Sequence, residues 1–492
     1  MKKKLFILAA ALLAALMLPM LFSCGDEFDQ LKDEVTVYKM ELIYNDFNKT
    51  LSGKNTVDYH NSADVPLESL SFMLHANAYR RDAQFRPVSS MHYVKAYPSG
   101  LSYGGIEVSK VEIGGKAAEF ETGGDDLNVL SVRLPEKLYP GDRVEIYMEY
   151  TIKLANIRHR LGYAEDTVNL GNFFPVAAIY ESGSFKTYPY YSAGDPFYTE
   201  SSNFEVTLTA PKSFTVAATG EILSQTEQGD NKVTKISAQV VRDFAMVMSE
   251  KFEVIETEAE GTRILYYHYR DDGAQENLNA AADAVKTFNR LFGEYRYPTL
   301  SVVKCDFVFG GMEYPQLVYI SDTLSKLVFT EVIVHEIAHQ WWYAMVGSNQ
   351  VEHAWLDEAL ADFSTALFYH ENPKYGVTLD EYVESCAQSF RTFTTVYKQV
   401  LGEVDTSMNR PLGGYLTELE YTAVVYSRGT VMLSQARTSM GSEKFLKGLQ
   451  KYFERNCFKI ASPAEFFGCM DSAARAKVSA LMESFINGEA VI

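Results

Sequence analysis

Two histidines and a glutamate in the middle of the chain have the spacing of a metal site. His335-Glu336-Ile337-Ala338-His339 lies inside an apolar stretch with helical character. Positions i and i+4 share one face of an α-helix, so both imidazoles can reach the same ion. Glu336 follows the first histidine and can point at water beside that ion. This HExxH pattern indicates zinc, the alternative being a helix with two hydrogen-bonded core histidines.

A third ligand and a supporting carboxylate follow further along the chain. Glu358 lies nineteen residues after His339 in a second helical segment, and Asp362 follows one turn later on the same face. Two histidines and one glutamate leave a coordination position open, as in catalytic rather than structural zinc sites. Because zinc-bound imidazoles usually donate their second N–H to a carboxylate, we expect Asp362 to orient His335. The alternative for Asp362 is a solvated helical aspartate.

Four motifs in this order resemble the gluzincin metallopeptidases of the membrane alanyl aminopeptidase family, which also contains leukotriene hydrolase. Besides HExxH and Glu358, Gly310-Gly311-Met312-Glu313-Tyr314 stands at the place of the family's Gly-x-Met-Glu-Asn loop. Tyr426-Ser427-Arg428-Gly429 stands at the place of its Tyr-x-Lys-Gly motif. The resemblance implies an N-terminal β-sandwich, a thermolysin-like catalytic domain and one zinc ion per chain.

The resemblance also implies a hydrolytic mechanism and roles for its residues. His335, His339 and Glu358 would ligate zinc, which would polarise the scissile carbonyl and lower the pKa of the attacking water. Glu336 would be the general base and would pass the proton to the leaving amine. Tyr426 would donate its phenol proton to the developing oxyanion.

The loop before the zinc helix is expected to select the substrate. By the resemblance, Glu313 anchors the free α-amine of a peptide, which makes an exopeptidase. Gly310, Gly311 and Met312 would form an edge strand along which the substrate backbone can lie. Tyr421 precedes Tyr426 by five residues and would either line the pocket or pack within the helices.

Departures from the family pattern keep other functions open. Tyr314 replaces the usual Asn, Asp357 and Ala359 replace the Asn and Gly that flank the glutamate, and Arg428 replaces Lys. We find no glutamine near residues 161–172 to help hold the α-amine, and no large C-terminal helical domain. The leading hypothesis is a zinc aminopeptidase. The alternatives are an open-cleft zinc endopeptidase and a catalytically silent surface binding lipoprotein.

Residues 35–254 carry the pattern of half-buried strands. Val144, Ile146, Met148, Tyr150, Ile152 and Leu154 alternate with polar neighbours, and residues 204–208 do the same before Pro211. Turn-rich stretches separate these segments, which predicts an all-β sandwich domain. An aromatic cluster within it is expected to pack at a domain interface: Tyr188, Tyr190, Tyr191, Phe197 and Tyr198.

Residues 255–492 have a different pattern, a few strands followed by helices. Strands are expected at 264–269 and 300–309, with a helix between them that carries Leu278 and Phe292. Further helices are expected at 329–346, 356–369, 421–440 and 443–455, and Ser462-Pro463 is typical of a helix start. This is an α+β domain, in which the strands and helices must position the metal site.

The first residues indicate export. Three lysines precede an apolar run from Leu5 to Phe22, and Leu21-Phe22-Ser23-Cys24-Gly25 resembles a bacterial lipobox. We expect residues 1–23 to be a lipoprotein signal peptide, Cys24 the lipidated N-terminus and 24–34 a tether. The protein would then be membrane-anchored outside the cytoplasm, facing the periplasm or the cell surface. An uncleaved membrane anchor or simple secretion is the alternative.

Composition agrees with a globular protein and argues against one class of partner. The formal net charge is −19, which repels phosphate backbones, so we expect no nucleic acid partner. The resemblance to the aminopeptidase family instead implies peptide substrates. If Cys24 carries lipid, four cysteines remain without C-x-x-C spacing, which allows either disulfides or free thiols. The oligomeric state stays open.

Overall fold

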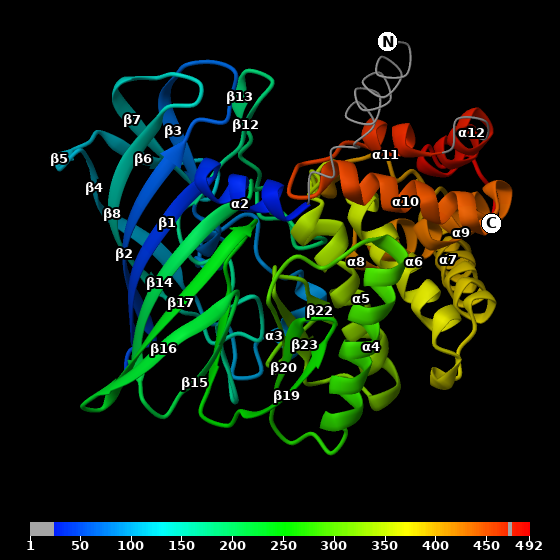
Figure 1. Ribbon diagram of the computed structural model, residues 1–492, viewed down its shortest axis with the longest axis horizontal. Coiled ribbons are helices and arrows are strands. Elements are labelled where there is room, and N and C mark those ends of the chain that lie inside the picture. Colours follow the sequence, from blue (N-terminus) through cyan, green and yellow to red (C-terminus); the bar gives the residue numbers. More distant parts are fainter. Residues whose placement is uncertain (1–23, 471–474) are drawn as a thin grey trace, which may run out of the picture.

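The protein has a β-rich domain and a helical domain that lie side by side. The computed structural model describes residues 24–470 and 475–492. The β-rich domain runs from blue to green in Figure 1, and the small sheet and the helices run from green to red. This arrangement confirms the predicted fold class, all-β followed by α+β.

One eight-stranded sheet forms the outer wall of the β-rich domain. Its strand order is β16-β17-β14-β1-β2-β8-β4-β5, with β1 and β14 parallel. The bounds are β1 (Thr36–Asn45), β2 (Thr50–His60), β4 (Gly105–Ile113), β5 (Lys116–Ala117), β8 (Arg143–Lys153), β14 (Ser202–Pro211), β16 (Glu221–Gln228) and β17 (Asn231–Val241).

The alternation predicted for residues 144–154 places one face of β8 in the core. Ile146, Met148 and Ile152 are fully buried between more exposed neighbours. Tyr150 points the same way and faces Gly53 of the paired strand β2, where a Cβ would lie 2.3 Å from the phenol ring. A glycine is therefore needed opposite this tyrosine.

Smaller sheets connect the outer wall to the helical domain. One has the order β11-β3-β7-β6 and another β15-β18-β10-β9, and β12 pairs with β13. Their bounds are β3 (Leu67–Met73), β6 (Phe120–Gly123), β7 (Val129–Leu138), β9 (Leu161–Tyr163), β10 (Val168–Leu170), β11 (Val176–Ala177), β12 (Tyr180–Glu181), β13 (Ser184–Phe185), β15 (Thr215–Ala218) and β18 (Met246–Ser249). The short helical turns are η1 (His75–Tyr79), η2 (Ser90–His92) and α3 (Tyr93–Ala96).

The second domain begins with a five-stranded sheet in the order β19-β20-β21-β23-β22. Its strands are β19 (Glu253–Ala259), β20 (Thr262–His268), β21 (Thr299–Cys305), β22 (Gly311–Met312) and β23 (Leu317–Ser321). The first strand starts at Glu253, two residues before the predicted domain start at 255. The two-residue edge strand β22 carries the glycine and methionine of the predicted substrate loop.

The predicted helices are present apart from a break in the one over 329–346, and the structure adds helices over residues 379–401 and 475–486 that the sequence pattern did not predict. They are α4 (Ala274–Phe292), α5 (Lys326–Ala338), α6 (Trp355–Glu371), α7 (Leu379–Leu401), α8 (Glu418–Tyr421), α9 (Arg428–Met440), α10 (Ser442–Asn456), α11 (Pro463–Cys469) and α12 (Arg475–Ile486). Short turns are η4 (Pro373–Tyr375) and η5 (Leu412–Gly414). Ser462 and Glu465 form a capping box on α11, as the Ser-Pro pair predicts.

The prediction of a continuous helix over 329–346 is wrong, whereas the helix predicted over 421–440 is present and contains a π-helical turn. The first helix ends at His339 and passes into η3 (Gln340–Met345), a π-helical turn with non-helical angles at Trp342 and Tyr343. The second contains a π-helical turn, η6 (Thr422–Ser427), between α8 and α9. The apolar spacing continues through both π-helical turns, so the periodicity of the sequence does not reveal them. Such turns are frequent at functional sites.

The segment expected as a tether forms helix α2 (Cys24–Glu34) and packs against the body. Phe28 lies with its ring centroid 5.1 Å from that of Phe458 and 6.4 Å from that of Tyr297, both in the helical domain. The predicted signal peptide, residues 1–23, lies outside the described residues, as does the side chain of Cys24. Within the described chain, every helix is too short or too polar to cross a membrane. Cys305, Cys386 and Cys469 carry free thiols.

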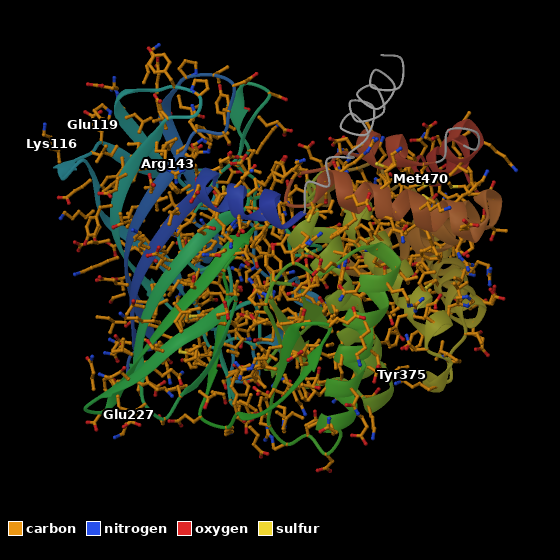
Figure 2. The ribbon with its side chains drawn as sticks, in the orientation of Figure 1. Lys116, Glu119, Arg143, Glu227, Tyr375 and Met470 are labelled. Atoms are coloured by element: carbon orange, nitrogen blue, oxygen red, sulfur yellow. The ribbon has the colours of Figure 1, made fainter. Side chains whose placement is uncertain are left out.

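A buried arginine ties the β-rich domain to the helical domain. Arg242 follows β17, and its guanidinium donates to the carbonyl oxygens of Thr199, Tyr343 and Lys459. The last two carbonyls belong to the helical domain. In contrast, the charged residues labelled at the margins of the β-rich domain in Figure 2, Lys116, Glu119 and Glu227, project away from the helices.

We predict that Arg242→Met destabilises the protein. The substitution leaves three buried carbonyl oxygens without their donor, which costs about 3 kcal/mol in the free energy of unfolding. The measurement is the thermal unfolding midpoint by circular dichroism. Arg263→Met is the matched control, because exposed Arg263 pairs with Glu256 at the surface. Equal midpoints for the two variants would contradict a role for Arg242 in joining the domains.

Candidate metal and substrate site

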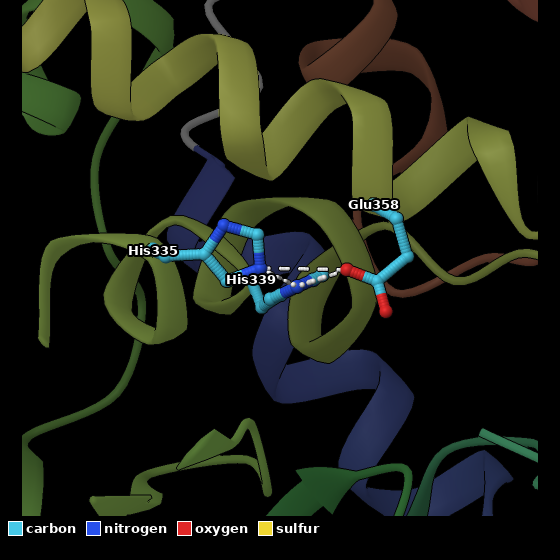
Figure 3. Close-up of side chains that lie close together, drawn as sticks. All are labelled: His335, His339 and Glu358. Atoms are coloured by element: carbon cyan, nitrogen blue, oxygen red, sulfur yellow. Dashed lines mark hydrogen bonds and ion pairs between the residues drawn. The ribbon is translucent and has the colours of Figure 1, made fainter. Parts of the chain in front are cut away.

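Helices α5 and α6 bring the three predicted metal ligands together. Nε2 of His339 lies 3.1 Å from Nε2 of His335 and 3.1 Å from Oε2 of Glu358, and His335 Nε2 lies 3.4 Å from the same oxygen. Figure 3 shows both imidazoles turned toward the Glu358 carboxylate. His339 and Glu358 are almost fully buried.

This donor set fits a zinc ion. The ligating atoms of the three residues all lie within 4.8 Å of one another, close enough to surround one cation. Two imidazoles and one carboxylate supply three of the four positions that zinc prefers and leave the fourth for water or substrate. Nearby, Oε2 of Glu336 is buried and has no hydrogen-bond partner among the described residues, so it is available to accept a proton or a hydrogen bond.

The second nitrogen of each histidine faces an oxygen. Nδ1 of His339 lies 3.1 Å from the carbonyl oxygen of Trp342, a contact that the break after α5 makes possible. Nδ1 of His335 lies 3.7 Å from Oδ1 of Asp362, the partner expected from the sequence. Asp362 is itself held by the hydroxyls of Tyr382 and Thr430, which donate to its two oxygens. Such contacts orient imidazoles toward a metal.

Burial and charge set the protonation of the metal-free site. Burial lowers the pKa of His339, but the carboxylates of Glu358 and Glu313 outweigh it and raise this pKa to about 10. Burial raises the pKa of Glu358, yet the two histidines bring it well below its usual range. The metal-free site therefore holds protons on its imidazoles, and metal binding must release them.

The proposed general base lies against the edge strand. A Cβ on Gly311 would lie 2.4 Å from Oε1 of Glu336, so only glycine lets β22 approach this carboxylate. Burial raises the pKa of Glu336 to about 7, against the lowering effect of His335 and His339. A carboxylate of raised pKa is suited to accept and return a proton near neutral pH.

The two predicted tyrosines both reach Glu358. The phenol of Tyr426 donates a hydrogen bond to Oε1 of Glu358, and its ring stacks on His335 with centroids 5.6 Å apart. Tyr421 also points at Oε1 of Glu358, at 3.5 Å, and its side chain is buried along the cavity wall. Tyr421 is the last residue of α8 and Tyr426 lies within the π-helical turn η6, and both tyrosines reach the same carboxylate.

Glu313 lies at the end of the site near His339. Oxygen atoms of Glu313 and Glu336 and a nitrogen of His339 lie within 4.8 Å of one another. Burial raises the pKa of Glu313 well above its usual value, and the largest further contribution comes from Asp195. Gln350 donates to Oε1 of Glu313 at 3.4 Å.

Asp195 and Arg160 belong to the β-rich domain and were missed by sequence reasoning. Arg160 donates to the buried carboxylate of Asp195 and lies with Nε 3.0 Å from the sulfur of Met312. Both residues line the same cavity as Glu313. Both residues lie outside the range 161–172 in which a glutamine was expected. The sequence feature that could have indicated Asp195 is a charged residue after Gly194 within a tyrosine-rich segment.

The cavity along these residues has a volume of about 1080 Å³. It extends past the metal site on both sides, with Gly310 and Gly311 along one wall. At its mouth, His92 of the β-rich domain forms an ion pair with Glu418 of α8. The two domains therefore enclose the cavity jointly.

Two of the departures from the family pattern, Tyr314 and Arg428, have structural explanations. The hydroxyl of Tyr314 donates to Asn172 of the β-rich domain at 2.7 Å, and Asn172 in turn donates to Asp243. Buried Arg428 points away from the metal and donates to the carbonyl oxygens of Phe485 and Ala490 near the C-terminus. These residues support the fold around the site rather than the site itself.

The aromatic cluster lies at the domain junction, as its pattern suggested. The hydroxyl of Tyr188 donates to Glu352 at 2.7 Å and accepts from Asn349 at 2.9 Å, both in the helical domain. Tyr190 and Phe197 pack around the buried His75.

Known proteins share this arrangement of residues. Residues 276–485 match the peptidase family M1 domain. The match spans α4 to α12 and includes every residue of the HExxH, glutamate and tyrosine motifs. It confirms the resemblance seen in the sequence and indicates zinc as the metal.

Curated relatives are aminopeptidases of greater length. Aminopeptidase N of Lactobacillus delbrueckii subsp. lactis is 26% identical over 228 residues, 43% of this chain and 26% of the relative. Endoplasmic reticulum aminopeptidase 2 of Bos taurus is 24% identical over 371 residues, 69% of this chain and 37% of the relative. This chain thus matches about a quarter to two fifths of these relatives.

A solved structure shares the fold over nearly the full length. The M1 zinc metallopeptidase of Deinococcus radiodurans has a TM-score of 0.67 and 18% sequence identity. The similarity covers 93% of this chain and 95% of that one. The β-rich domain and the M1 domain therefore recur together in that protein.

We predict that Asp362→Asn weakens zinc binding. An amide cannot supply the negative charge that faces Nδ1 of His335, so the affinity should fall about 10- to 100-fold. Competition with a chromophoric chelator measures the affinity. Asp380→Asn, at an exposed position of α7, is the matched control. Unchanged zinc affinity in Asp362→Asn would show that this aspartate does not support the metal site.

We predict that Asp243 makes stability depend on pH. Burial raises the pKa of Asp243 to about 7 in the folded protein, whereas an unfolded aspartate titrates near about 3.9. The folded state therefore binds the proton more tightly, and this stabilisation is lost as the pH rises from about 4 to about 7. Asp243→Asn cannot ionise and should reduce this loss.

Thermal midpoints across this pH range measure the effect. The exposed Asp272→Asn is the control and should keep the wild-type pH profile. Parallel profiles for wild type and Asp243→Asn would contradict the prediction.

Proposed function

We propose that this protein is a zinc-dependent metallo-aminopeptidase that hydrolyses N-terminal peptide bonds outside the cytoplasm. The observation that carries the proposal is the pair of buried carboxylates, Glu313 and Asp195, beside the His-His-Glu cluster in one cavity. A peptide with a free N-terminus brings an ammonium group that can neutralise this pair. The M1 domain and the aminopeptidase relatives support the proposal, and a related Deinococcus radiodurans structure holds a Tyr-Ser-Ala substrate.

The residues act in sequence along the cavity. Glu313 and Asp195 bind the α-amine and fix the first residue, with Arg160 holding Asp195 in place. Zinc, when bound, supplies a Lewis acid for the carbonyl and an activated water. Glu336 takes a proton from the attacking water and returns it to the nitrogen of the broken C–N bond. Tyr426 donates a hydrogen bond to the oxyanion that forms at the carbonyl.

We further propose that the protein is a lipoprotein anchored to a membrane through Cys24. The support is in the sequence alone: the basic residues, the apolar run and the lipobox-like segment up to Cys24. Mass spectrometry of the N-terminal peptide from native membranes tests this directly. A diacylated Cys24 supports it, and an intact Met1 in the membrane fraction identifies an uncleaved anchor instead.

We predict that the enzyme cleaves peptides with free N-termini and rejects their N-acetylated counterparts. Residues 25–492 loaded with zinc should release the first residue from free peptides, and Glu336→Gln should lose at least about a thousandfold in kcat. Asp195→Asn and Glu313→Gln should raise KM for free peptides, because each removes one charge from the amine site.

The outcomes separate the competing functions. Cleavage of acetylated peptides would identify an endopeptidase. Stoichiometric zinc without turnover of either set would favour a silent binding protein.

A further inference from the structure

The cavity continues past the metal site on the side opposite the amine anchors. Glu313 lies near His339, at the C-terminal end of α5. Glu331 lines the cavity from the same helix, one turn before His335 and two turns before His339. At about 1.5 Å per residue, Glu331 stands about 12 Å along the axis from His339. One cavity includes Glu313, the metal-ligand cluster and Glu331, so a substrate whose amine lies at Glu313 can extend its leaving-group side along this cavity toward Glu331.

Glu331 has a carboxylate without a direct partner among the described residues. Its side chain is half-buried, and no hydrogen bond or ion pair within the described residues engages it. Burial raises its pKa, the carboxylate of Asp362 raises it further, and His335 offsets part of this increase. A half-buried carboxylate without a partner is costly, so its environment favours a cation.

Other charged groups on this side of the cavity are engaged or distant. Glu381 accepts hydrogen bonds from Thr378 in the cap of α7, and Glu418 pairs with His92. Arg160 pairs with Asp195 at the opposite end, and Lys95 is exposed at the mouth. Glu331 is thus the carboxylate on this side of the cavity that is available to pair with a cationic group of a substrate.

The surface around Glu331 suits a long cationic side chain. Val328 and Val332 lie on the same helix and line the cavity beside it. Val328 keeps 42% of its surface exposed, and Val332 is half-buried. Lysine and arginine combine an apolar stem with a charged head, and such stems pack on apolar surface while the head reaches a carboxylate.

We propose that Glu331 is a specificity residue that binds a lysine or arginine side chain immediately after the scissile bond. This inference rests on the proposed aminopeptidase function, since it needs the amine bound at Glu313. The preferred substrates are then peptides with a basic second residue. Glu331 selects the substrate and takes no part in bond breaking.

Matched dipeptide amides test the proposal. Alanyl-lysinamide and alanyl-norleucinamide share an unbranched stem and differ in the terminal ammonium. We expect kcat/KM to favour the lysine substrate about 10- to 100-fold, the range of one charge-assisted hydrogen bond. Glu331→Gln should abolish this preference, while Glu384→Gln, exposed on α7 and paired with Arg391, should keep it. Equal rates in the wild type, or a preference that survives Glu331→Gln, would overturn the proposal.

Two further measurements separate this proposal from the aminopeptidase function. Alanine para-nitroanilide has no second residue, so Glu331→Gln should hydrolyse it at the wild-type rate, and failure of the wild type to do so would count against the function. Calorimetry on Glu336→Gln measures binding of both amides without turnover. We expect the lysine amide to bind about tenfold more tightly, and equal affinities would refute the role of Glu331 whatever the activity.

Discussion

The charge of one buried carboxylate, Glu358, determines the arrangement of the site. Both imidazoles and the phenol of Tyr426 turn toward it, and Tyr421 approaches the same group. An ionised carboxylate in a protein interior is tolerated only where cations and donors surround it. The break after α5 and the π-helical turn before α9 bring these groups within reach. The same charge makes the pocket a strong site for a divalent ion.

The β-rich domain contributes to this site directly. It supplies Asp195 and Arg160 to the amine end of the cavity and closes the mouth through His92. It also supports the substrate loop through Asn172, whose side chain accepts from Tyr314. Tyr314 stands where the family has a smaller polar residue, and Gly171 leaves space for it, since a Cβ there would lie 2.0 Å from the phenol oxygen. The two domains therefore form one functional unit joined by buried polar contacts.

Much of the fold and of the metal site follows from local patterns. The period-two alternation in β8 and the helical spacing around His335 reflect interactions between residues that are close in sequence. His335 and His339 could be predicted as a pair because i, i+4 spacing on a helix fixes a shared face. Glu358 lies on another helix and was predicted from its distance after His339, which matches the family pattern. The π-helical turns could not be predicted from the sequence because such a turn depends on contacts made from outside the helix. One such contact is the hydrogen bond that Trp342 Nε1 donates to Ser364.

The sequence by itself determined the class of chemistry: HExxH, a distant glutamate and a tyrosine motif predict a zinc site. The tertiary structure alone decided which further charged residues line the cavity beside that site. Asp195 lies near Glu313, and Glu331 has no partner among the described residues, because segments far apart in the chain meet at one cavity. Charge compensation between such residues is a property of three-dimensional packing, and no spacing rule along the chain encodes it.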